Sequence, residues 1–251
     1  MILKGRGVSP GTTEGKVVKV DEPVSFLGDV DPTTGMVFEE KDISDSIFVF
    51  PKGKGSTVGS YVIYQLKKNK HAPKAIVNQE TETIVAAGAI ISDIPLIDNI
   101  DIDLLKDWDE VNIDGTTGKL ELVNIKPTPV VTSFIEKEDK LLIVKRSDEV
   151  GSFQGKWSAI SGYLEGKDPL EQAKIEISQE TDMDVELVKK GNTILGRGED
   201  NIWEVHPFLF KTQEEPVLNW ENLEYRWVTK KELKELKTVP KLLEAYEEVK
   251  R

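Results

Sequence analysis

A proline-containing stretch near the middle of the chain, NIKPTPVV (residues 124–131), separates two series of strand-like and helical segments. Each proline lacks a backbone donor and restricts the residue before it, so such a stretch favours an extended connection. The chain has 251 residues, which is long for one hydrophobic core and ordinary for two. The sequence therefore predicts two domains, residues 1–125 and 126–251, each with mixed α and β structure.

The composition narrows the class of partner. The formal net charge is -12 and 31% of the residues are charged, which argues against nucleic acid or an anionic membrane as the main partner. No apolar run approaches the length that spans a bilayer, and the first residues lack a secretory pattern. Cysteine is absent and there are two histidines, so thiolate-held clusters and His-rich metal sites are unexpected in this chain. We expect a cytoplasmic protein.

The first half carries short β-type runs separated by glycine-containing turns, with one helical pattern between them. The helical pattern covers Thr57 to about Lys68, because its apolar residues recur at helical spacing. The β-type runs are Gly15–Val20, Ser46–Phe50, Lys74–Asn78, Thr83–Ile91 and Lys119–Val123.

The stretch FPKGKGSTVGSYVIY (residues 50–64) combines glycines, lysines and hydroxyl side chains within a few residues. A Walker A loop requires Gly, four residues and then Gly-Lys-Ser/Thr, and this frame fails because Gly53-Lys54 is followed by Gly55. What remains is a strand, a glycine-rich turn and a helix that starts near Ser56. A serine at a helix start is an ordinary N-cap, so a purely structural role is an alternative.

The same position would also suit an ionised hydroxyl. At a helix start, Ser56 would face unpaired backbone N–H groups and the positive end of the helix dipole, which stabilise an alkoxide. Gly53 and Gly55 would let a ligand approach the backbone closely. Lys52 and Lys54 would lower the cost of negative charge and suit a phosphate.

Most of residues 1–125 resembles one family. The stretches that carry the resemblance are GRGVSPGTTEGKVV, EPVSFLGDVDPTTG, FPKGKGSTVGSYVIYQL, APKAIVN and IVAAGAIISDIPLID. They are similar to the small subunits of aconitase-X type dehydratases, above all those of archaeal phosphomevalonate dehydratases. The resemblance implies a swivelling β/β/α domain of isoprenoid biosynthesis in which Ser56 is the proton acceptor. It also implies conversion of mevalonate 5-phosphate to trans-anhydromevalonate 5-phosphate and water.

The resemblance further implies that this chain forms half of an active site. Such dehydratases use a 4Fe-4S cluster held by cysteines of a separate large subunit, so we expect a heterodimer or a higher assembly that is inactive without that partner. Candidate contacts to the small phosphorylated substrate are Gly55, Thr57, Ser60 and Lys54, although helix capping explains Thr57 and Ser60 equally well. The chain departs from the family at Asp29, where glycine is usual, and in a shorter stretch between Gly35 and Phe48.

The second half restarts with strand-like runs and contains a helical pattern from about Asp168 to Thr181. The stretch GKWSAISGYLEGKDPLEQAKIEISQETDMDV (residues 155–185) resembles a Nudix domain, which implies an α/β/α sandwich. In that family, carboxylates on one helix face hold Mg²⁺ against a diphosphate. Glu176 and Glu180 are the candidate metal ligands here, because residues four apart share a helix face.

The Nudix pattern is degenerate in this chain. Ile175 replaces the usual arginine, Gln179 replaces a metal-binding carboxylate, and Asp182 replaces a late glycine. A neutral amide in place of a charged oxygen ligand weakens divalent metal binding. We therefore favour a binding or regulatory role for this domain over hydrolysis.

The sequence thus predicts a dehydratase small subunit that carries a Nudix-like domain. Two alternatives come from other classes: an active Nudix hydrolase, and a module that senses a phosphorylated metabolite, in either case with an attached swivel domain. A dehydratase for another aconitase-X substrate, such as a hydroxyproline, is the alternative within the leading class.

Overall fold

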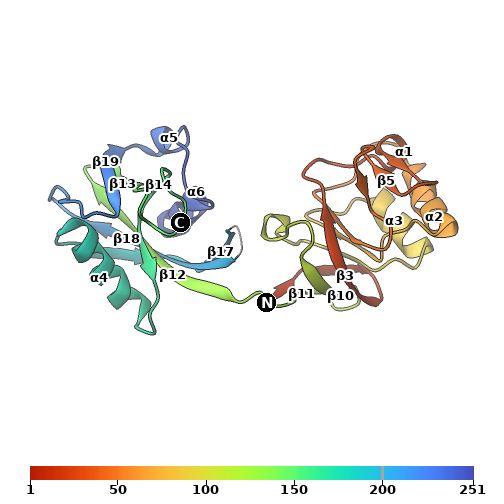
Figure 1. The fold of residues 1–251 in the computed structure, drawn as a ribbon, viewed down its shortest axis with the longest axis horizontal. Coiled ribbons are helices and arrows are strands. Elements are labelled where there is room, and N and C mark those ends of the chain that lie inside the picture. Colours follow the sequence, from red (N-terminus) through yellow and green to blue (C-terminus); the bar gives the residue numbers. More distant parts are fainter. Residues whose placement is uncertain (199–200) are drawn as a thin grey trace. The chain divides into compact units, whose positions relative to one another are not determined.

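Strands and helices alternate along both halves of the chain in the computed structural model, which describes residues 1–198 and 201–251 (Figure 1). The chain divides into two compact units, Met1–Lys126 (unit 1) and Pro127–Arg251 (unit 2). Among the helices formed by the described residues, none has the length and apolar character needed to cross a membrane.

Unit 1 is built on an eight-stranded mixed sheet in the order β1-β11-β10-β3-β7-β8-β9-β2. The neighbours β3, β7, β8 and β9 run parallel, and the flanking strands pair antiparallel. The strands of this sheet are β1 (Ile2–Lys4), β2 (Arg6–Ser9), β3 (Thr12–Lys19), β7 (Ile47–Phe50), β8 (Ala75–Asn78), β9 (Leu96–Asp98), β10 (Glu110–Asp114) and β11 (Lys119–Leu122). A small three-stranded sheet contains β4 (Val30–Asp31), β5 (Met36–Val37) and β6 (Lys41–Asp42).

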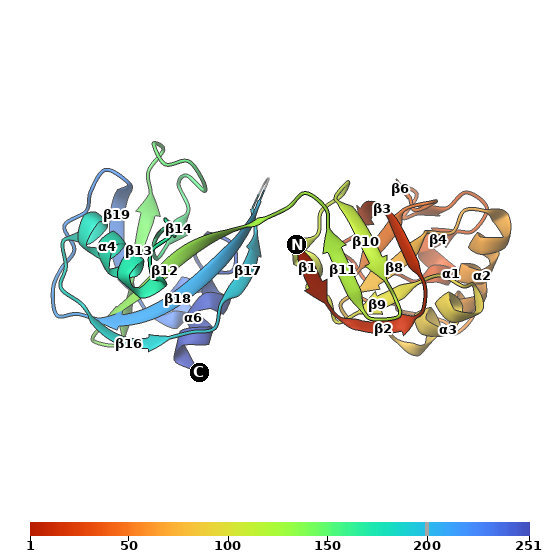
Figure 2. The same cartoon turned by 90° about the horizontal axis from the view of Figure 1, so that it is seen from below.

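Three α-helices and one 3-10 helix complete unit 1. They are α1 (Phe26–Asp29), α2 (Gly59–Asn69), α3 (Thr83–Ile91) and η1 (Ile102–Leu104). Both views place α1, α2 and α3 together at the end of the unit opposite β1 (Figures 1 and 2). Because α2 connects β7 to β8 and α3 connects β8 to β9, the loops that enter these helices meet at the carboxyl ends of parallel strands. Ligands commonly bind at such an edge.

The run Thr83–Ile91 was predicted as a strand, and this prediction was wrong because it forms α3. A short apolar run fits either a buried strand or a buried helix. The deciding feature is Glu82, whose carboxylate accepts hydrogen bonds from the N–H groups of Ile84 (2.6 Å) and Val85 (3.1 Å) and so caps a helix start.

The core of unit 1 lies between the sheet and these helices. Phe48 and Phe50 of β7 are fully buried with ring centroids 4.6 Å apart, and Phe26 of α1 packs edge-on against Phe50 at 5.8 Å. From the helices, Ile63 and Leu66 of α2 are buried in the same cluster. The strand that leads into the Ser56 loop is therefore anchored in the middle of the core.

Unit 2 is a second mixed sheet covered by helices on both faces. Its central pair, β12 and β18, is parallel over ten residues of each strand. The strands are β12 (Pro127–Lys137), β13 (Lys140–Arg146), β14 (Trp157–Ser158), β15 (Ile160–Tyr163), β16 (Glu186–Lys190), β17 (Ile194–Arg197), β18 (Ile202–Lys211) and β19 (Asn222–Val228). The helices are α4 (Pro169–Thr181), α5 (Lys230–Leu233) and α6 (Leu242–Lys250).

Two separate apolar clusters show that the sheet of unit 2 is the middle layer of a sandwich. Ala173 and Ile177 of α4 pack in one cluster, and Leu242 and Tyr246 of α6 pack in the other. Figure 2 shows α4 and α6 on opposite sides of β12 and β18. This is the α/β/α arrangement that the sequence predicts.

The proline-containing stretch is extended, as its composition predicts, but it belongs to the sheet. β12 starts at Pro127, and both Pro127 and Pro129 lie opposite residues of β18 in the parallel register. The antiparallel partner β15 begins to pair only at Val130. Prolines are tolerated near the start of a strand because fewer ladder hydrogen bonds are lost there.

Candidate functional site

The loop between β7 and α2 presents Ser56 on the surface of unit 1. Residues 54–58 are all exposed, whereas Gly53 and Gly59 on either side are buried. The Ser56 hydroxyl oxygen accepts a hydrogen bond from the Val58 N–H (3.3 Å), and the Gly59 N–H donates to the Ser56 carbonyl (2.9 Å). Ser56 therefore closes a turn that leads into the helix.

The predicted start of this helix at Thr57 was wrong by two residues, because α2 begins at Gly59. Ser56 consequently lies one turn before the helix and does not serve as its N-cap. The interaction expected from a helix start is nevertheless present, since a backbone N–H points at the Ser56 hydroxyl oxygen. Such a donor stabilises negative charge on that oxygen.

The two glycines of the loop let it approach other parts of unit 1. Gly55 has φ +95°, a conformation that favours glycine. A Cβ atom on Gly53 would clash with the Glu82 carboxylate, and one on Gly55 would lie 2.8 Å from the Ser25 hydroxyl. Both glycines are thus explained by contacts within the protein, and substrate contact by Gly55 stays a prediction.

The segment before α1 supports the loop from the other side. The Val24 N–H donates to the Lys52 carbonyl (3.0 Å), and the Lys54 N–H donates to the Val24 carbonyl (2.9 Å). The Asp29 carboxylate accepts the Ser25 N–H (2.8 Å) and lies 3.5 Å from the Lys54 ammonium. Sequence reasoning missed this support, because a serine followed by an acidic residue indicates a helix start but not which loop that helix start contacts.

The structure places the predicted substrate contacts on the same surface as Ser56. Lys54 and Thr57 are exposed, and Ser60 is partly buried at the first turn of α2. The Ser60 hydroxyl donates to the Thr57 carbonyl (3.0 Å), which is a capping interaction. Lys54 pairs with the partly exposed carboxylate of Asp29, and such pairs contribute little to stability. A negatively charged ligand could therefore replace the Asp29 carboxylate as the partner of the Lys54 ammonium.

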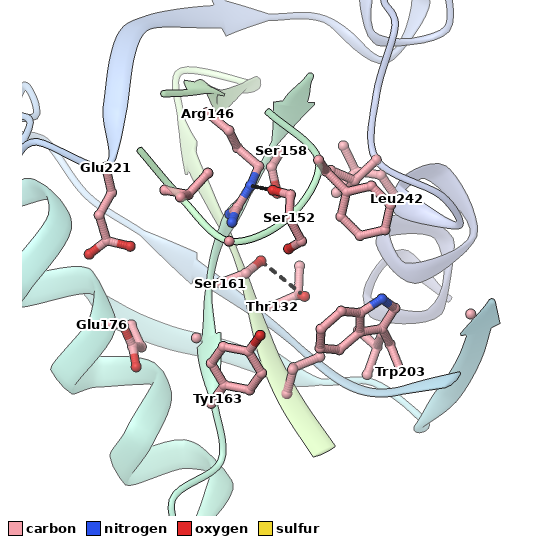
Figure 3. A pocket seen from close by; sticks show the side chains of 18 of the residues that line it. Thr132, Arg146, Ser152, Ser158, Ser161, Tyr163, Glu176, Trp203, Glu221 and Leu242 are labelled. Carbon is pink, nitrogen blue, oxygen red and sulfur yellow. Dashed lines mark hydrogen bonds between the residues drawn. The ribbon is translucent and has the colours of Figure 1, made fainter. Parts of the chain in front are cut away.

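A second candidate site is a cavity of about 310 Å³ in unit 2 (Figure 3). Aromatic side chains form one wall, with the ring of Trp203 5.8 Å from Tyr163 and 6.4 Å from Phe153. Figure 3 shows the Arg146 guanidinium over the cavity, and its Nε donates to the Ser152 carbonyl (2.9 Å). A cavity of this size suits a small organic ligand. Its lining mixes apolar side chains with charged ones, which include the carboxylates of Glu149, Glu165, Glu176 and Glu221.

Glu176 and Glu180, the predicted metal ligands, lie in different surroundings. Glu176 lines the cavity, and its carboxylate accepts a hydrogen bond from the Gln172 side chain (2.6 Å). Burial, together with the nearby charges of Glu221 and Glu165, raises the pKa of Glu176 above its ordinary value.

Glu180 is buried, and burial raises its pKa to about 8. One carboxyl oxygen accepts a hydrogen bond from the Asn222 side chain (2.6 Å), and the other has no partner. A carboxyl group with this pKa is mostly protonated at neutral pH. Glu180 is not among the side chains that line the cavity.

The side chains present fit a divalent cation poorly. Mg²⁺ prefers charged oxygen ligands, whereas Glu180 is mostly neutral and Gln179 is an amide. Among residues 1–198 and 201–251, no group of three or more His, Cys, Asp or Glu side chains is placed to hold a metal ion. Magnesium binding at this helix stays a prediction that the geometry does not favour.

Sequence reasoning missed Arg146, Trp203 and Glu221 at the second site. They come from three separate segments: the end of β13, β18 and the connection before β19. Only the folded sheet brings these segments to one cavity, so no local spacing marks them.

Two family descriptions cover almost the whole chain. Residues 2–122 match the aconitase X swivel domain and residues 126–249 match the NUDIX domain, which confirms the fold class predicted from the sequence. The phosphomevalonate dehydratase small subunit of Methanosarcina acetivorans is 53% identical over 137 residues, which are 51% of this chain and 95% of that protein. The chain belongs, through its first half, to the phosphomevalonate dehydratase small subunit family.

Two further matches concern the same half of the chain. The phosphomevalonate dehydratase small subunit of Thermococcus kodakarensis is 54% identical over 129 residues, which are 49% of this chain and 97% of that protein. The crystal structure of Thermococcus kodakaraensis aconitase X in its holo-form has 52% identity and a TM-score of 0.49, and the match covers 49% of this chain and 99% of that one.

Proposed function

We propose that unit 1 is the small subunit of a phosphomevalonate dehydratase, with Ser56 as the proton acceptor. The substrate would be mevalonate 5-phosphate, and the products trans-anhydromevalonate 5-phosphate and water. The observation that carries this proposal is the Ser56 hydroxyl itself. It lies exposed beyond the carboxyl end of a parallel strand and accepts a backbone N–H.

The proposed chemistry requires an oxygen base that takes a proton from the carbon next to the substrate carboxylate. Ser56 in its alkoxide form would do so, and its oxygen would become the hydroxyl seen in the structure. The Val58 N–H stabilises the alkoxide because it already points at this oxygen. Lys52 and Lys54 add positive charge nearby and would meet the substrate phosphate. Thr57 and Ser60 would orient the substrate.

The metal chemistry would come from the partner. Because this chain has no cysteine, it offers no thiolate to an iron–sulfur cluster. A 4Fe-4S cluster held by the large subunit would act as the Lewis acid that assists departure of the substrate hydroxyl. The proposal therefore requires a heterodimer or a higher assembly in which this chain supplies the base.

Reconstitution tests this proposal. The full chain is expected to show no dehydration of mevalonate 5-phosphate alone, and to show turnover when mixed anaerobically with the cluster-bearing large subunit from the same organism. Formation of the product is followed by phosphorus NMR. A stable complex without turnover of mevalonate 5-phosphate, or with turnover of another hydroxy acid, would assign the chain to a different aconitase-X substrate.

We further propose that unit 2 is a binding domain for a phosphorylated metabolite, and that it regulates the dehydratase. Two observations support binding over hydrolysis. The Arg146 guanidinium and an aromatic wall face the same cavity (Figure 3), and a guanidinium pairs well with a phosphate group, although four glutamates line the cavity as well. The Glu180 carboxyl, expected to hold the metal for hydrolysis, is buried against Asn222. Prenyl diphosphates are the natural candidates, because the proposed dehydratase makes their precursors.

Calorimetric titration of isopentenyl and geranylgeranyl diphosphate into the full chain tests the binding role. We expect binding in the presence of EDTA and slow hydrolysis with Mg²⁺. Arg146→Gln should weaken binding about tenfold or more, because a hydrogen bond to a charged group is lost. The matched control is Arg226→Gln, since Arg226 stacks on Trp157 and does not line the cavity. Rapid hydrolysis of any nucleoside, sugar or prenyl diphosphate would instead favour an active Nudix enzyme.

A further inference from the structure

The Asp29 carboxylate is fixed in α1 and reaches the side chain of a loop residue. Its Oδ2 atom accepts the Ser25 N–H (2.8 Å) and lies 3.5 Å from the Lys54 ammonium. The backbone of Asp29 is fixed as well, because its N–H donates to the Ser25 carbonyl (2.7 Å) and its carbonyl accepts the Phe38 N–H (2.8 Å). The carboxylate therefore keeps its place whether or not the ammonium is paired with it.

The Lys54 side chain is the movable partner of this ion pair. The Lys54 N–H is held by the Val24 carbonyl (2.9 Å), but the Lys54 side chain is long and 49% exposed, against 23% for Asp29. Lys54 lies two residues before Ser56 in the chain. Its ammonium can therefore turn toward a ligand at the Ser56 loop, whereas the Asp29 carboxylate stays behind it.

One other carboxylate lies against the loop, and its charge is offset differently. Glu82 packs on Gly53, and its two carboxylate oxygens accept the N–H groups of Ile84 (2.6 Å) and Val85 (3.1 Å). These donors stand at the positive end of α3, which offsets much of the negative charge. Asp29 accepts the Ser25 N–H and pairs with Lys54, so its charge acts more directly on an anion bound at Lys54.

An anion that binds Lys54 meets two opposite charges. The ammonium attracts it, and the Asp29 carboxylate repels it from a position 3.5 Å from that ammonium. Two like charges about 5 Å apart at a protein surface repel enough to change an equilibrium constant by severalfold. The ion pair must also open, at least in part, before Lys54 can bind the ligand.

We propose that Asp29 is a positioning residue that holds the Lys54 ammonium in the empty site and weakens binding of the substrate's anionic group there. This inference rests on the proposed function, in which Lys54 meets the substrate phosphate. An anionic group that takes no part in bond breaking is bound equally in the ground state and in the transition state. Asp29 should therefore affect KM and leave kcat nearly unchanged.

Kinetics of the complex between the full chain and its large subunit test this inference. Asp29→Asn removes the charge but keeps an oxygen that can accept the Ser25 N–H, so the fold should tolerate it. We expect KM for mevalonate 5-phosphate to fall about fivefold, with kcat within about twofold. A merely structural role would not lower KM. Asp21→Asn is the matched control, because it removes a charge from an 83% exposed side chain that pairs with Lys19.

Two further measurements show whether the effect passes through Lys54. In a Lys54→Gln background, Asp29→Asn should leave KM unchanged, because the two side chains are coupled. Inorganic phosphate and acetate, used as competitive inhibitors, identify the anionic group that Lys54 meets. Phosphate, or acetate if Lys54 meets the substrate carboxylate, should inhibit the Asp29→Asn complex at a lower concentration than the natural one. Unchanged inhibition by both anions contradicts the proposal.

The outcomes separate this inference from the proposed function. An unchanged or higher KM for Asp29→Asn, in a complex that dehydrates mevalonate 5-phosphate, overturns the role of Asp29 and leaves the proposed function standing. A fall in KM that persists in the Lys54→Gln background overturns it as well. A lower KM of Asp29→Asn in a complex that acts only on another hydroxy acid retains the role of Asp29 and overturns mevalonate 5-phosphate as the substrate.

Discussion

Replacing Ser56 by alanine is expected to lower kcat of the reconstituted dehydratase by about a hundredfold or more, as removal of a general base typically does. Alanine lacks the oxygen that would take the proton, and two nearby polar side chains are poor replacements for it. The Lys54 ammonium has no acceptor lone pair and pairs with Asp29, while the Ser60 hydroxyl donates to a backbone carbonyl. The loss should appear equally in kcat and kcat/KM, because the proton moves in the transition state.

The same variant should leave folding and assembly unchanged. The Ser56 side chain is exposed and accepts a long hydrogen bond from the Val58 N–H, so its removal costs little stability. The affinity of the Ser56→Ala chain for the large subunit should match that of the natural chain. Ser44→Ala is a suitable control, because Ser44 interacts with His71 and not with the Ser56 loop. Turnover of the Ser56→Ala complex within a few-fold of the natural rate would remove Ser56 from the mechanism.

The strand–loop–helix around Ser56 was accessible from the sequence because its signals are local. Apolar residues before the glycines predict the buried strand, and helical spacing after them predicts α2. The supports of the loop were not accessible, because Ser25 and Glu82 come from segments about thirty residues away on either side. The spacing of apolar residues also gave the wrong prediction for α3, because one capping side chain decides there between helix and strand.

In unit 2, the sequence predicts the helix that carries Glu176 and Glu180 but not what those residues contact. Spacing places both on one helix face. Whether a carboxyl group on that face is a metal ligand or a buried acid depends on its neighbours. For Glu180 the neighbour is Asn222, the first residue of β19 and 42 positions along the chain. Such a contact follows from sheet order, which no local pattern encodes.

Replacing Glu180 by glutamine is expected to raise the free energy of unfolding of unit 2, because of the surroundings of this side chain. The ordinary pKa of this group is 4.5, and burial raises it to about 8 in the folded chain. Between these pH values the unfolded chain releases a proton that the folded chain keeps. Stability of unit 2 should therefore fall as pH rises from 4.5 to 8, and it should then stay low.

Glutamine is neutral at every pH and can still accept the Asn222 hydrogen bond. The stability of the variant should therefore not fall over this pH range. About two and a half pH units separate the ordinary pKa from pH 7, and each unit corresponds to about 1.4 kcal/mol. The free energy of unfolding of Glu180→Gln should then exceed that of the natural chain by about 3 kcal/mol at pH 7. The two should be nearly equal at about pH 4, where both states of the natural chain are protonated.

Urea unfolding in EDTA, at several pH values, measures this difference. Tryptophan fluorescence reports on unit 2 when Trp108 is replaced by phenylalanine, because the other four of the five tryptophans lie at or after Trp157. Glu235→Gln is the control, since Glu235 is exposed in the same unit and its change should stay within about 0.5 kcal/mol. Equal stability of Glu180→Gln and the natural chain at pH 7 would show that Glu180 is ionised in the folded state. In that case the helix would retain one of its charged metal ligands, and hydrolysis by unit 2 would again be the leading alternative.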